Sequence, residues 1–181
     1  MRADQQLQVL AEHEIPDSSS KEIVDLLEVC FPATFDGRTY YKQLPHFRLL
    51  WWIGGKLVAQ LGIDSRVVNV DARILKIFGV IDLCVHPEHR SSGMASQMLS
   101  KVEEIARLHD RDHLVLMADR HDVYLKCGFV RVEPAFVTWL AIDERKTVDV
   151  FHRDLSDCFL VKPLSSEAWP AGEIDMLGYL F

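Results

Sequence analysis

The amino-acid sequence predicts a mixed α+β fold built on one sheet with a single parallel crossover. Residues 47–63 alternate with the period of strands around a Gly54-Gly55 turn, which is typical of a β-hairpin. Residues 93–109 carry apolar side chains at helical spacing, and this helix stands between two apolar strand segments, residues 73–85 and 113–117. A strand, a helix and a second strand in this order predict a parallel β-α-β unit beside the hairpin.

The N-terminal part of the chain is predicted to form a short strand and a helix. The strand lies around residues 8–11 and the helix covers residues 21–30. Ser19, followed by Glu22 three residues later, has the pattern of a capping box, which signals the start of this helix. Residues 31–42 contain proline and glycine, so we expect a loop with a short helix there.

The rest of the chain alternates between strand and helix patterns. The predicted elements after the hairpin are a continuation of its second strand at residues 67–70, a strand at 73–85, a helix at 93–109, a strand at 113–117, a short helix at 123–126, a strand at 129–142 and a last strand at 158–163. The remaining residues are rich in Trp, Gly and acids, and we expect them to form a tail. The C-terminal strand and tail together occupy residues 150–181.

Length and charge limit the function classes. The 181 residues predict a single domain, residues 1–181, and 49% of them are hydrophobic, which is enough for a core without disulfides or metals. There are 20 basic and 27 acidic side chains, which gives a formal net charge of -7. Nucleic-acid binding needs a basic face, so this balance argues against a nucleic-acid partner. It favours a small cationic or amine-bearing substrate.

The cysteines and the apolar segments indicate a reduced, cytoplasmic protein. The four cysteines are widely spaced without a Cys-x-x-Cys pair, and the chain begins without the apolar stretch of a signal peptide. The most apolar region, residues 49–63, is interrupted by Gly54-Gly55-Lys56. It is shorter than the ~18 apolar residues of a membrane span, so we expect no membrane insertion.

The segment from Ile81 to Ser96 carries the chemistry. Its pattern predicts a strand, a turn stopped by Pro87, and a second turn with Arg90 and Gly93 that opens directly into the long helix. A helix N-terminus presents unpaired N–H groups and the positive end of the helix dipole, and a glycine there lets an anion approach the backbone. The pattern therefore predicts a pyrophosphate cradle. Neither a Walker loop nor a Gly-x-Gly-x-x-Gly motif is present.

The motif Val85-x-Pro87-x-x-Arg90-x-x-Gly93-x-Ala95 resembles the acetyl-CoA signature of the GCN5-related N-acetyltransferases (GNAT superfamily). A second element, Tyr124-Leu-Lys-Cys-Gly-Phe, is similar to the Tyr-x-x-x-Gly-Phe of that family. The resemblance covers the core motif region, residues 49–139. Alanine replaces a common glycine in the first motif, and its small side chain keeps the cradle open.

The resemblance implies a central mixed, mostly antiparallel sheet flanked by helices, with the parallel β-α-β crossover at the acetyl-CoA site. Backbone groups of Leu83 and Val85 would pair with the pantetheine arm, and the amides from Arg90 to Ser96 would hold the pyrophosphate. Tyr124 would lie near the thioester sulfur and protonate the leaving thiolate. The residues expected to contact the cosubstrate acetyl-CoA are Leu83, Cys84, Val85, Arg90, Ser91, Ser92, Gly93, Met94, Ala95, Ser96 and Tyr124.

Asp82 is the candidate general base. The attacking amine must be neutral, whereas a free alkylamine is mostly protonated at pH 7. Asp82 interrupts an apolar strand and faces away from Leu83 and Val85 by strand alternation. Burial of an unpaired carboxylate is costly, which suggests a role for this one. The alternative is a structural aspartate bonded to a neighbouring loop.

The sequence predicts only the chemical class of the acceptor substrate. The acidic residue three positions before Val85 is similar to one in aminoglycoside 2'-N-acetyltransferases, and the acidic, Trp-bearing tail is similar to theirs and to that of nodulation-type N-acyltransferases. The candidate acceptor contacts are Phe35, Trp51, Glu173 and Asp175. One of Trp51 and Trp52 is expected in the core and the other at the acceptor cleft, and a plain surface tail is the alternative for the two acids.

The resemblance implies an acetyl-CoA-dependent N-acetyltransferase that acts on a primary amine of a small molecule, such as an amino sugar or aminoglycoside, by direct transfer in a ternary complex. Two alternatives stay open: a non-catalytic acyl-CoA-binding or sensing module, and an N-acyltransferase with a longer acyl donor. A homodimer is also open.

Other chemistry-bearing residues have simpler interpretations. His86 and His89 form a His-x-x-His pair without further ligands, so no metal is expected. Cys84 and Cys127 have no paired histidine that would suggest an acyl-cysteine intermediate, and small buried hydrophobic residues are the simpler interpretation.

Overall fold

The computed structural model describes residues 4–143 and 145–181 of the chain. They divide into two compact units. The first contains the chain up to Asp64 together with Val80–Met98, and the second contains Ser65–Gly79 and Leu99–Phe181. Two strands and one helix contribute residues to both units.

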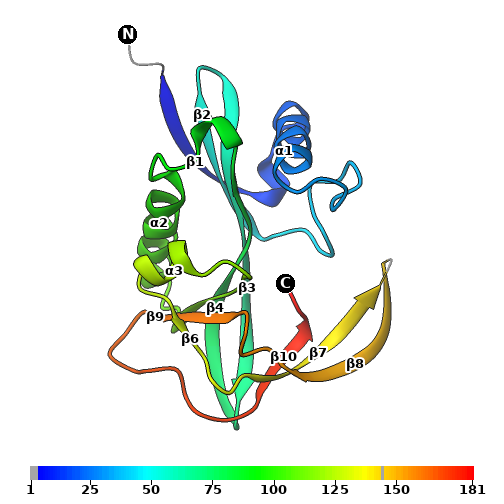
Figure 1. Ribbon diagram of the computed structural model, residues 1–181, viewed down its shortest axis with the longest axis vertical. Coiled ribbons are helices and arrows are strands. Elements are labelled where there is room, and N and C mark those ends of the chain that lie inside the picture. The colour runs from blue at the N-terminus through cyan, green and yellow to red at the C-terminus, as the bar shows by residue number, and fades with distance from the viewer. Residues whose placement is uncertain (1–3, 144) are drawn as a thin grey trace. The chain divides into compact units, whose positions relative to one another are not determined.

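In the first unit, antiparallel strands pack against one helix (Figure 1). Its elements are β1 (Gln5–Ala11), α1 (Asp17–Cys30), β2 (Phe47–Ile53), the first part of β3 (Lys56–Val70), the end of β4 (Arg73–Val85) and the start of α2 (Met94–Leu108), with one-turn 3₁₀ helices at Glu12–Glu14 and Pro87–His89. The helical spacing of α1 turns Ile23, Leu26 and Leu27 into the core, where they meet Leu50 of β2 and Leu57 of β3.

The second unit is a mixed sheet with two parallel pairs. Its further elements are β5 (His113–Met117), α3 (Asp122–Lys126), β6 (Val130–Arg131), β7 (Phe136–Asp143), β8 (Lys146–Asp154), β9 (Phe159–Pro163) and β10 (Ile174–Tyr179). The strand order is β6-β9-β5-β4-β3-β10-β7-β8. β4 and β5 are parallel with Phe78 opposite Leu114, and the helix between them in sequence is α2. This confirms the predicted α+β fold and its parallel crossover.

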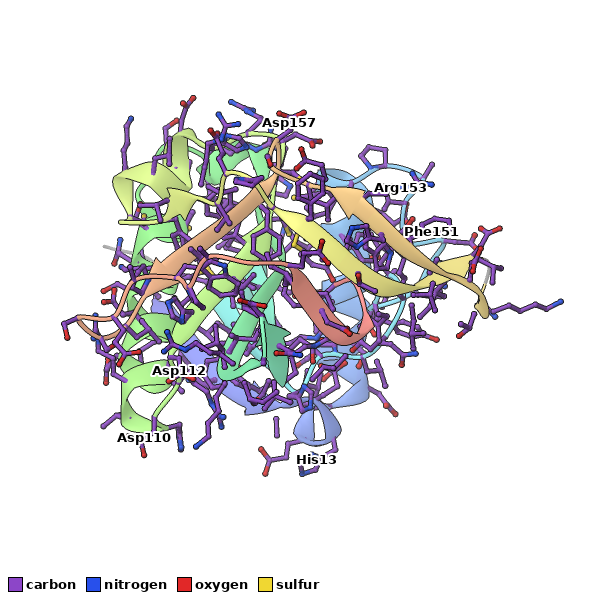
Figure 2. All side chains as sticks on the ribbon, turned by 90° about the horizontal axis from the view of Figure 1, so that it is seen from below. His13, Asp110, Asp112, Phe151, Arg153 and Asp157 are labelled. Atoms are coloured by element: carbon purple, nitrogen blue, oxygen red, sulfur yellow. The ribbon has the colours of Figure 1, made fainter. Side chains whose placement is uncertain are left out.

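The hairpin of β7 and β8 lies at one end of the strand order of the second unit (Figure 1). Phe151 of β8 packs edge-on against Trp139 of β7, with ring centroids 5.7 Å apart. Figure 2 labels Phe151 and Arg153, two residues apart on β8, and the Arg153 guanidinium lies 4.4 Å from the Phe151 ring centroid. Phe151 thus packs β8 against β7, whereas the remaining side chains of β8 are exposed.

Several predicted boundaries are wrong. Helix α1 begins at Asp17 after Pro16, and no side chain caps it, so Ser19 and Glu22 lie inside the helix and form no capping box. Residues 31–42 form turns without a helix. The strand predicted at residues 129–142 is divided into β6 and β7 around Pro134, which has no N–H for a ladder bond.

Two strands were not predicted. β8 lies between the strands predicted at residues 129–142 and 158–163, where no element was predicted. β10 was expected as part of a tail, but it lies between β3 and β7, antiparallel to the first and parallel to the second. The core of the second unit therefore includes tail residues Ile174 and Met176. No helix in the described part of the chain is long and apolar enough to cross a membrane.

Candidate active site

The end of β4 carries an irregularity at Asp82. Its φ angle is +52°, in the left-handed region, where aspartate is better tolerated than most side chains. Ile81, Asp82 and Leu83 are half-buried, and Cys84 is 6% exposed. β4 ends at Val85, and the amide of the next residue, His86, donates to the Val58 carbonyl of β3 at 2.8 Å.

A buried polar network holds the backbone at Asp82. The Gln60 side-chain amide donates to the Asp82 carbonyl oxygen at 2.7 Å, and the Gln60 side-chain oxygen accepts from Arg48 Nη1 at 3.0 Å. Arg48 is 0% exposed. Its guanidinium binds both carboxylate oxygens of Glu12, at 2.7 and 3.0 Å, and donates to the Thr39 carbonyl at 2.7 Å. Glu12, Arg48 and Gln60 therefore form a chain of hydrogen bonds that ends at the irregular residue of β4, and the bonds made by Arg48 are charge-assisted.

Sequence reasoning did not identify this network. Arg48 stands in the otherwise apolar run from Phe47 to Ile53, and Gln60 stands in the apolar run from Leu57 to Ile63. A charge or amide inside an apolar strand was the available signal, because a buried polar group requires a partner. The identity of the partners depends on strand register, which the pattern alone does not provide.

Burial raises the pKa of the Asp82 carboxyl to about 6, while the charge of Arg48 acts in the opposite direction. At neutral pH the group is therefore mostly ionised, and it is a stronger proton acceptor than an ordinary carboxylate. This is the property that a general base near neutral pH requires.

We expect Asp82→Asn to change stability in a pH-dependent way. The folded pKa of about 6 lies above the unfolded value of about 3.9, so the folded state binds more protons between these values and the wild type loses stability as pH rises through this window. The asparagine side chain of the variant does not titrate. Urea unfolding should therefore show a gain of about 3 kcal/mol for the variant at pH 7.5 that shrinks toward pH 4.

Asp25→Asn, at an exposed position of α1, is the control and should show no such difference. An equal effect of Asp82→Asn at both pH values would contradict the raised pKa.

The turn after β4 leads into α2, and backbone amides in the first turn of this helix are available to a ligand. Arg90 donates its amide to the Pro87 carbonyl at 3.3 Å and its Nε to the Val85 carbonyl at 3.3 Å, while Ser92 Oγ donates to the His89 carbonyl at 2.6 Å. The bond from the Gln97 amide to the Gly93 carbonyl, at 3.1 Å, opens the helix. Amides in the first turn have no carbonyl one turn earlier to bind, so they can accept an anion.

Gly93 is the position where this turn requires glycine. Its φ is +82°, and a Cβ there would meet only the Gln97 side chain, at 3.7 Å. Ser91, at φ +62°, and Gly93 are both exposed, and Met94 is buried under the helix start. The cradle predicted from the sequence is therefore an exposed N-terminal turn anchored by one buried methionine.

Tyr124 belongs to the second unit and lies in the short helix α3. Its ring meets that of Phe129 edge-on at 5.9 Å, and its carbonyl accepts the Phe129 amide at 3.1 Å. Gly128, at φ +85°, reverses the chain between them. Burial and, to a smaller extent, Cys127 raise the pKa of the Tyr124 phenol, so it is protonated at neutral pH and able to act as an acid.

The four candidate acceptor residues are in different environments. Phe35 is 2% exposed and packs against Phe31 in the core of the first unit, with ring centroids 5.7 Å apart, so its side chain offers no surface to a substrate. Trp51 is also buried, and Trp52 is half-buried, so of the two Trp52 fits a cleft position better. Glu173 is exposed, whereas the Asp175 carboxylate accepts the Leu177 amide at 2.8 Å.

His86 and His89 have their ring centroids 6.1 Å apart. In residues 4–143 and 145–181, no three His, Cys, Asp or Glu side chains gather in a way that would hold a metal ion.

Comparisons with known proteins find a matching family model and solved structures with a similar fold. A family model described as an acetyltransferase (GNAT) domain matches residues 13–132. Curated protein sequences give no match. Among solved structures, YhbS from Escherichia coli in complex with CoA has a TM-score of 0.66 at 16% identity, over 96% of this chain and 89% of that one.

Two further structures are similar over most of both chains. A GNAT family acetyltransferase from Brucella melitensis in complex with acetyl-CoA has a TM-score of 0.60 at 12% identity, over 93% of this chain and 94% of that one. ElaA from Escherichia coli has a TM-score of 0.57 at 19% identity, over 88% of this chain and 99% of that one. At these identities the structures show a common fold.

Proposed function

The chain belongs to the GNAT acetyltransferase family, and from this premise we propose that it transfers an acetyl group from acetyl-CoA to a primary amine of a small molecule, by direct transfer in a ternary complex. The observation that carries the proposal is the arrangement in which strand β4 ends and the exposed N-terminal turn of α2, at Gly93, follows it. The two ligand-bound neighbours, solved with CoA and acetyl-CoA, support the same cosubstrate class.

The residues present fit an acyl-CoA. The space beside Gly93 is open, and the exposed serines of the turn can add donors to the amides of the helix start. In our proposal the amides from Ser91 to Ser96 hold the pyrophosphate, and the backbone of Leu83 and Val85 pairs with the pantetheine amides. The Arg90 amide already donates to Pro87, so Arg90 contributes mainly its side-chain charge.

Two side chains carry the proton transfers in this proposal. Asp82, with its raised pKa, accepts the proton of the attacking amine, directly or through one water. Tyr124 donates its phenol proton to the leaving thiolate. Since the reference pKa of a tyrosine is about 10 and that of a thiol about 8.5, the transfer is modestly uphill, and its use is to avoid a free thiolate in a partly desolvated site.

We propose an amino sugar, an aminoglycoside or another small amine as the acceptor, in keeping with the net charge of -7. The test is release of CoA thiol from acetyl-CoA in the presence of a panel of such amines, with product masses measured. Amine-dependent release supports the proposal. Binding of acetyl-CoA without transfer to any amine would support an acyl-CoA-binding module instead, and transfer only from long-chain donors would support an N-acyltransferase.

Replacing Gly93 with Val is expected to weaken acetyl-CoA binding at least about tenfold. A side chain there crowds the approach to the backbone amides, and the φ of +82° strains a β-branched residue. Isothermal titration measures the change in Kd.

Gly55→Val is the matched control, because Gly55 has nearly the same φ, +81°, and equally open surroundings but lies in the turn between β2 and β3. It should lose similar stability and keep its affinity. Equal affinities in the two variants would argue against the cradle.

A further inference from the structure

The end of α1 brings Cys30 against the strand end to which we assign the pantetheine arm. Cys30 is the last residue of α1 and Cys84 lies on β4, far apart in sequence. Both side chains belong to one apolar cluster of the first unit, and each thiol shifts the pKa of the other. No local motif marks this pair, because the chain contains no Cys-x-x-Cys.

Both sulfur atoms have further polar contacts. The Cys30 thiol donates to the Val85 carbonyl oxygen at 3.6 Å, and Arg90 Nε donates to the same oxygen at 3.3 Å. A thiol and a guanidinium therefore meet at one backbone atom of the strand end. The Cys84 sulfur accepts the backbone amide of Gln60. This polar setting differs from that of a cysteine that only fills space in a core.

The contacts shift the pKa values of the two thiols in opposite directions. The hydrogen bond from Cys84 and then the charge of Arg90 lower the pKa of Cys30 to about 7, although burial opposes them. The hydrogen bond to Cys30, burial and the nearby Asp82 carboxylate raise the pKa of Cys84. Near pH 7, Cys30 therefore divides about equally between thiol and thiolate and supplies the nucleophile, while Cys84 is the protonated partner. Cys30 is half-buried, so a small oxidant can reach it more readily than Cys84.

We propose that Cys30 and Cys84 are a redox-active dithiol that a peroxide converts into a disulfide, and that this disulfide weakens acyl-CoA binding at the adjoining strand end. The Cys30 thiolate attacks one oxygen of hydrogen peroxide, which breaks the O–O bond and gives a sulfenic acid and, after protonation, water. The Cys84 sulfur then attacks the sulfenic sulfur, forms the S–S bond and releases a second water. A dithiol reductant reverses the change.

The effect on binding follows from where the bond forms. A disulfide has an S–S distance of about 2.05 Å, so the two free thiols must move into covalent contact. The Cys30 sulfur then has no proton to donate to the Val85 carbonyl. Cys84 stands between Leu83 and Val85, whose backbone we assign to pantetheine, so the end of α1 is tied to that segment. This second part of the inference depends on the proposed function, and disulfide formation itself does not.

The first experiment tests the covalent chemistry on the full chain. The reduced protein is treated with hydrogen peroxide, and peptides are mapped by mass spectrometry without reduction. We expect a Cys30–Cys84 crosslink that is lost in Cys30→Ser and in Cys84→Ser. Cys158→Ser is the matched control and should keep it, because burial raises the pKa of Cys158 and disfavours its thiolate. Absence of the crosslink in the wild type would overturn the proposal.

A second measurement separates a reactive pair from a structural one. The alkylation rate of Cys30 by iodoacetamide should reach half its maximum near pH 7 in the wild type, and Cys84→Ala should move this midpoint upward. Far-ultraviolet circular dichroism verifies that the variant is folded. An unchanged midpoint in a folded Cys84→Ala protein would contradict the pairing.

The third measurement compares the Kd for acetyl-CoA before oxidation, after oxidation and after treatment with dithiothreitol. We expect about a tenfold weaker affinity in the disulfide form and full recovery on reduction, with no change in oxidised Cys30→Ser. Equal affinities of the reduced and disulfide forms would overturn the control of binding. No binding by the reduced protein would instead refute the proposed function, while the crosslink would still report on the dithiol.

Discussion

Replacing Tyr124 with Phe is expected to lower kcat at least about 100-fold, while the Kd for acetyl-CoA changes less than about twofold. The substitution removes one hydroxyl and keeps the ring that packs edge-on against Phe129. Because burial raises the pKa of the Tyr124 phenol, the proton is present at neutral pH and available to the leaving thiolate. Steady-state thiol release gives kcat, and isothermal titration gives Kd.

Tyr41→Phe is the control, since Tyr41 is 50% exposed and has no assigned role in the chemistry. It should keep kcat within about twofold. A Tyr124→Phe enzyme with an unchanged kcat would contradict the acid role, and one with an unchanged kcat but a weaker Kd would assign Tyr124 to binding alone.

The second large effect is expected from Arg48→Met. The variant removes the cation that joins Glu12 to Gln60 and leaves two polar side chains without their partner, at a position that is 0% exposed. Breaking one side of a buried ion pair typically costs about 3–5 kcal/mol. For a chain of this size that corresponds to a Tm lower by roughly 6–20 °C. Urea unfolding and a thermal melt measure both quantities.

Arg73→Met is the matched control, because Arg73 also binds a glutamate, Glu167, at 2.9 Å but with both side chains largely exposed. An exposed pair contributes about 0–1 kcal/mol, so this variant should lose little. If Arg48→Met and Arg73→Met lose equal stability, the buried network does not have the weight that we assign to it.

The predictable part of the fold was the part with strong periodicity. The hairpin around Gly54-Gly55 and the strand over residues 73–85 contain runs of buried apolar residues, and the helix after Gly93 carries its apolar residues at helical spacing, so these patterns report the structure directly. β8 has exposed side chains at almost every position, so it lacks an apolar face and carries no such signal. β10 is held between β3 and β7 by long-range pairing, which local sequence does not reveal.

The candidate site likewise has a part that was predictable from the sequence and a part that was not. The turn at Gly93 and the unusual position of the Asp82 carboxylate were predictable, because a local motif and a charge in an apolar strand mark them in sequence. The left-handed backbone at Asp82, which interrupts the expected strand alternation, was not predicted. The environment of Asp82 was not, because Gln60 and Arg48 reach it from other strands. The pairing of Cys30 with Cys84 likewise depends on where α1 ends relative to β4. Phe35 is a different case, because this loop aromatic was expected to contact the acceptor, but its side chain is only 2% exposed.

The most direct test of the account is a thermal unfolding titration of the reduced protein with acetyl-CoA, CoA and a long-chain acyl-CoA. A ligand present at 100 times its Kd should stabilise the fold by about 2.7 kcal/mol. We predict a concentration-dependent rise in Tm with acetyl-CoA and with CoA, and a smaller rise in the Gly93→Val variant. No rise with any of the three ligands would contradict the acyl-CoA site on which the proposed reaction depends.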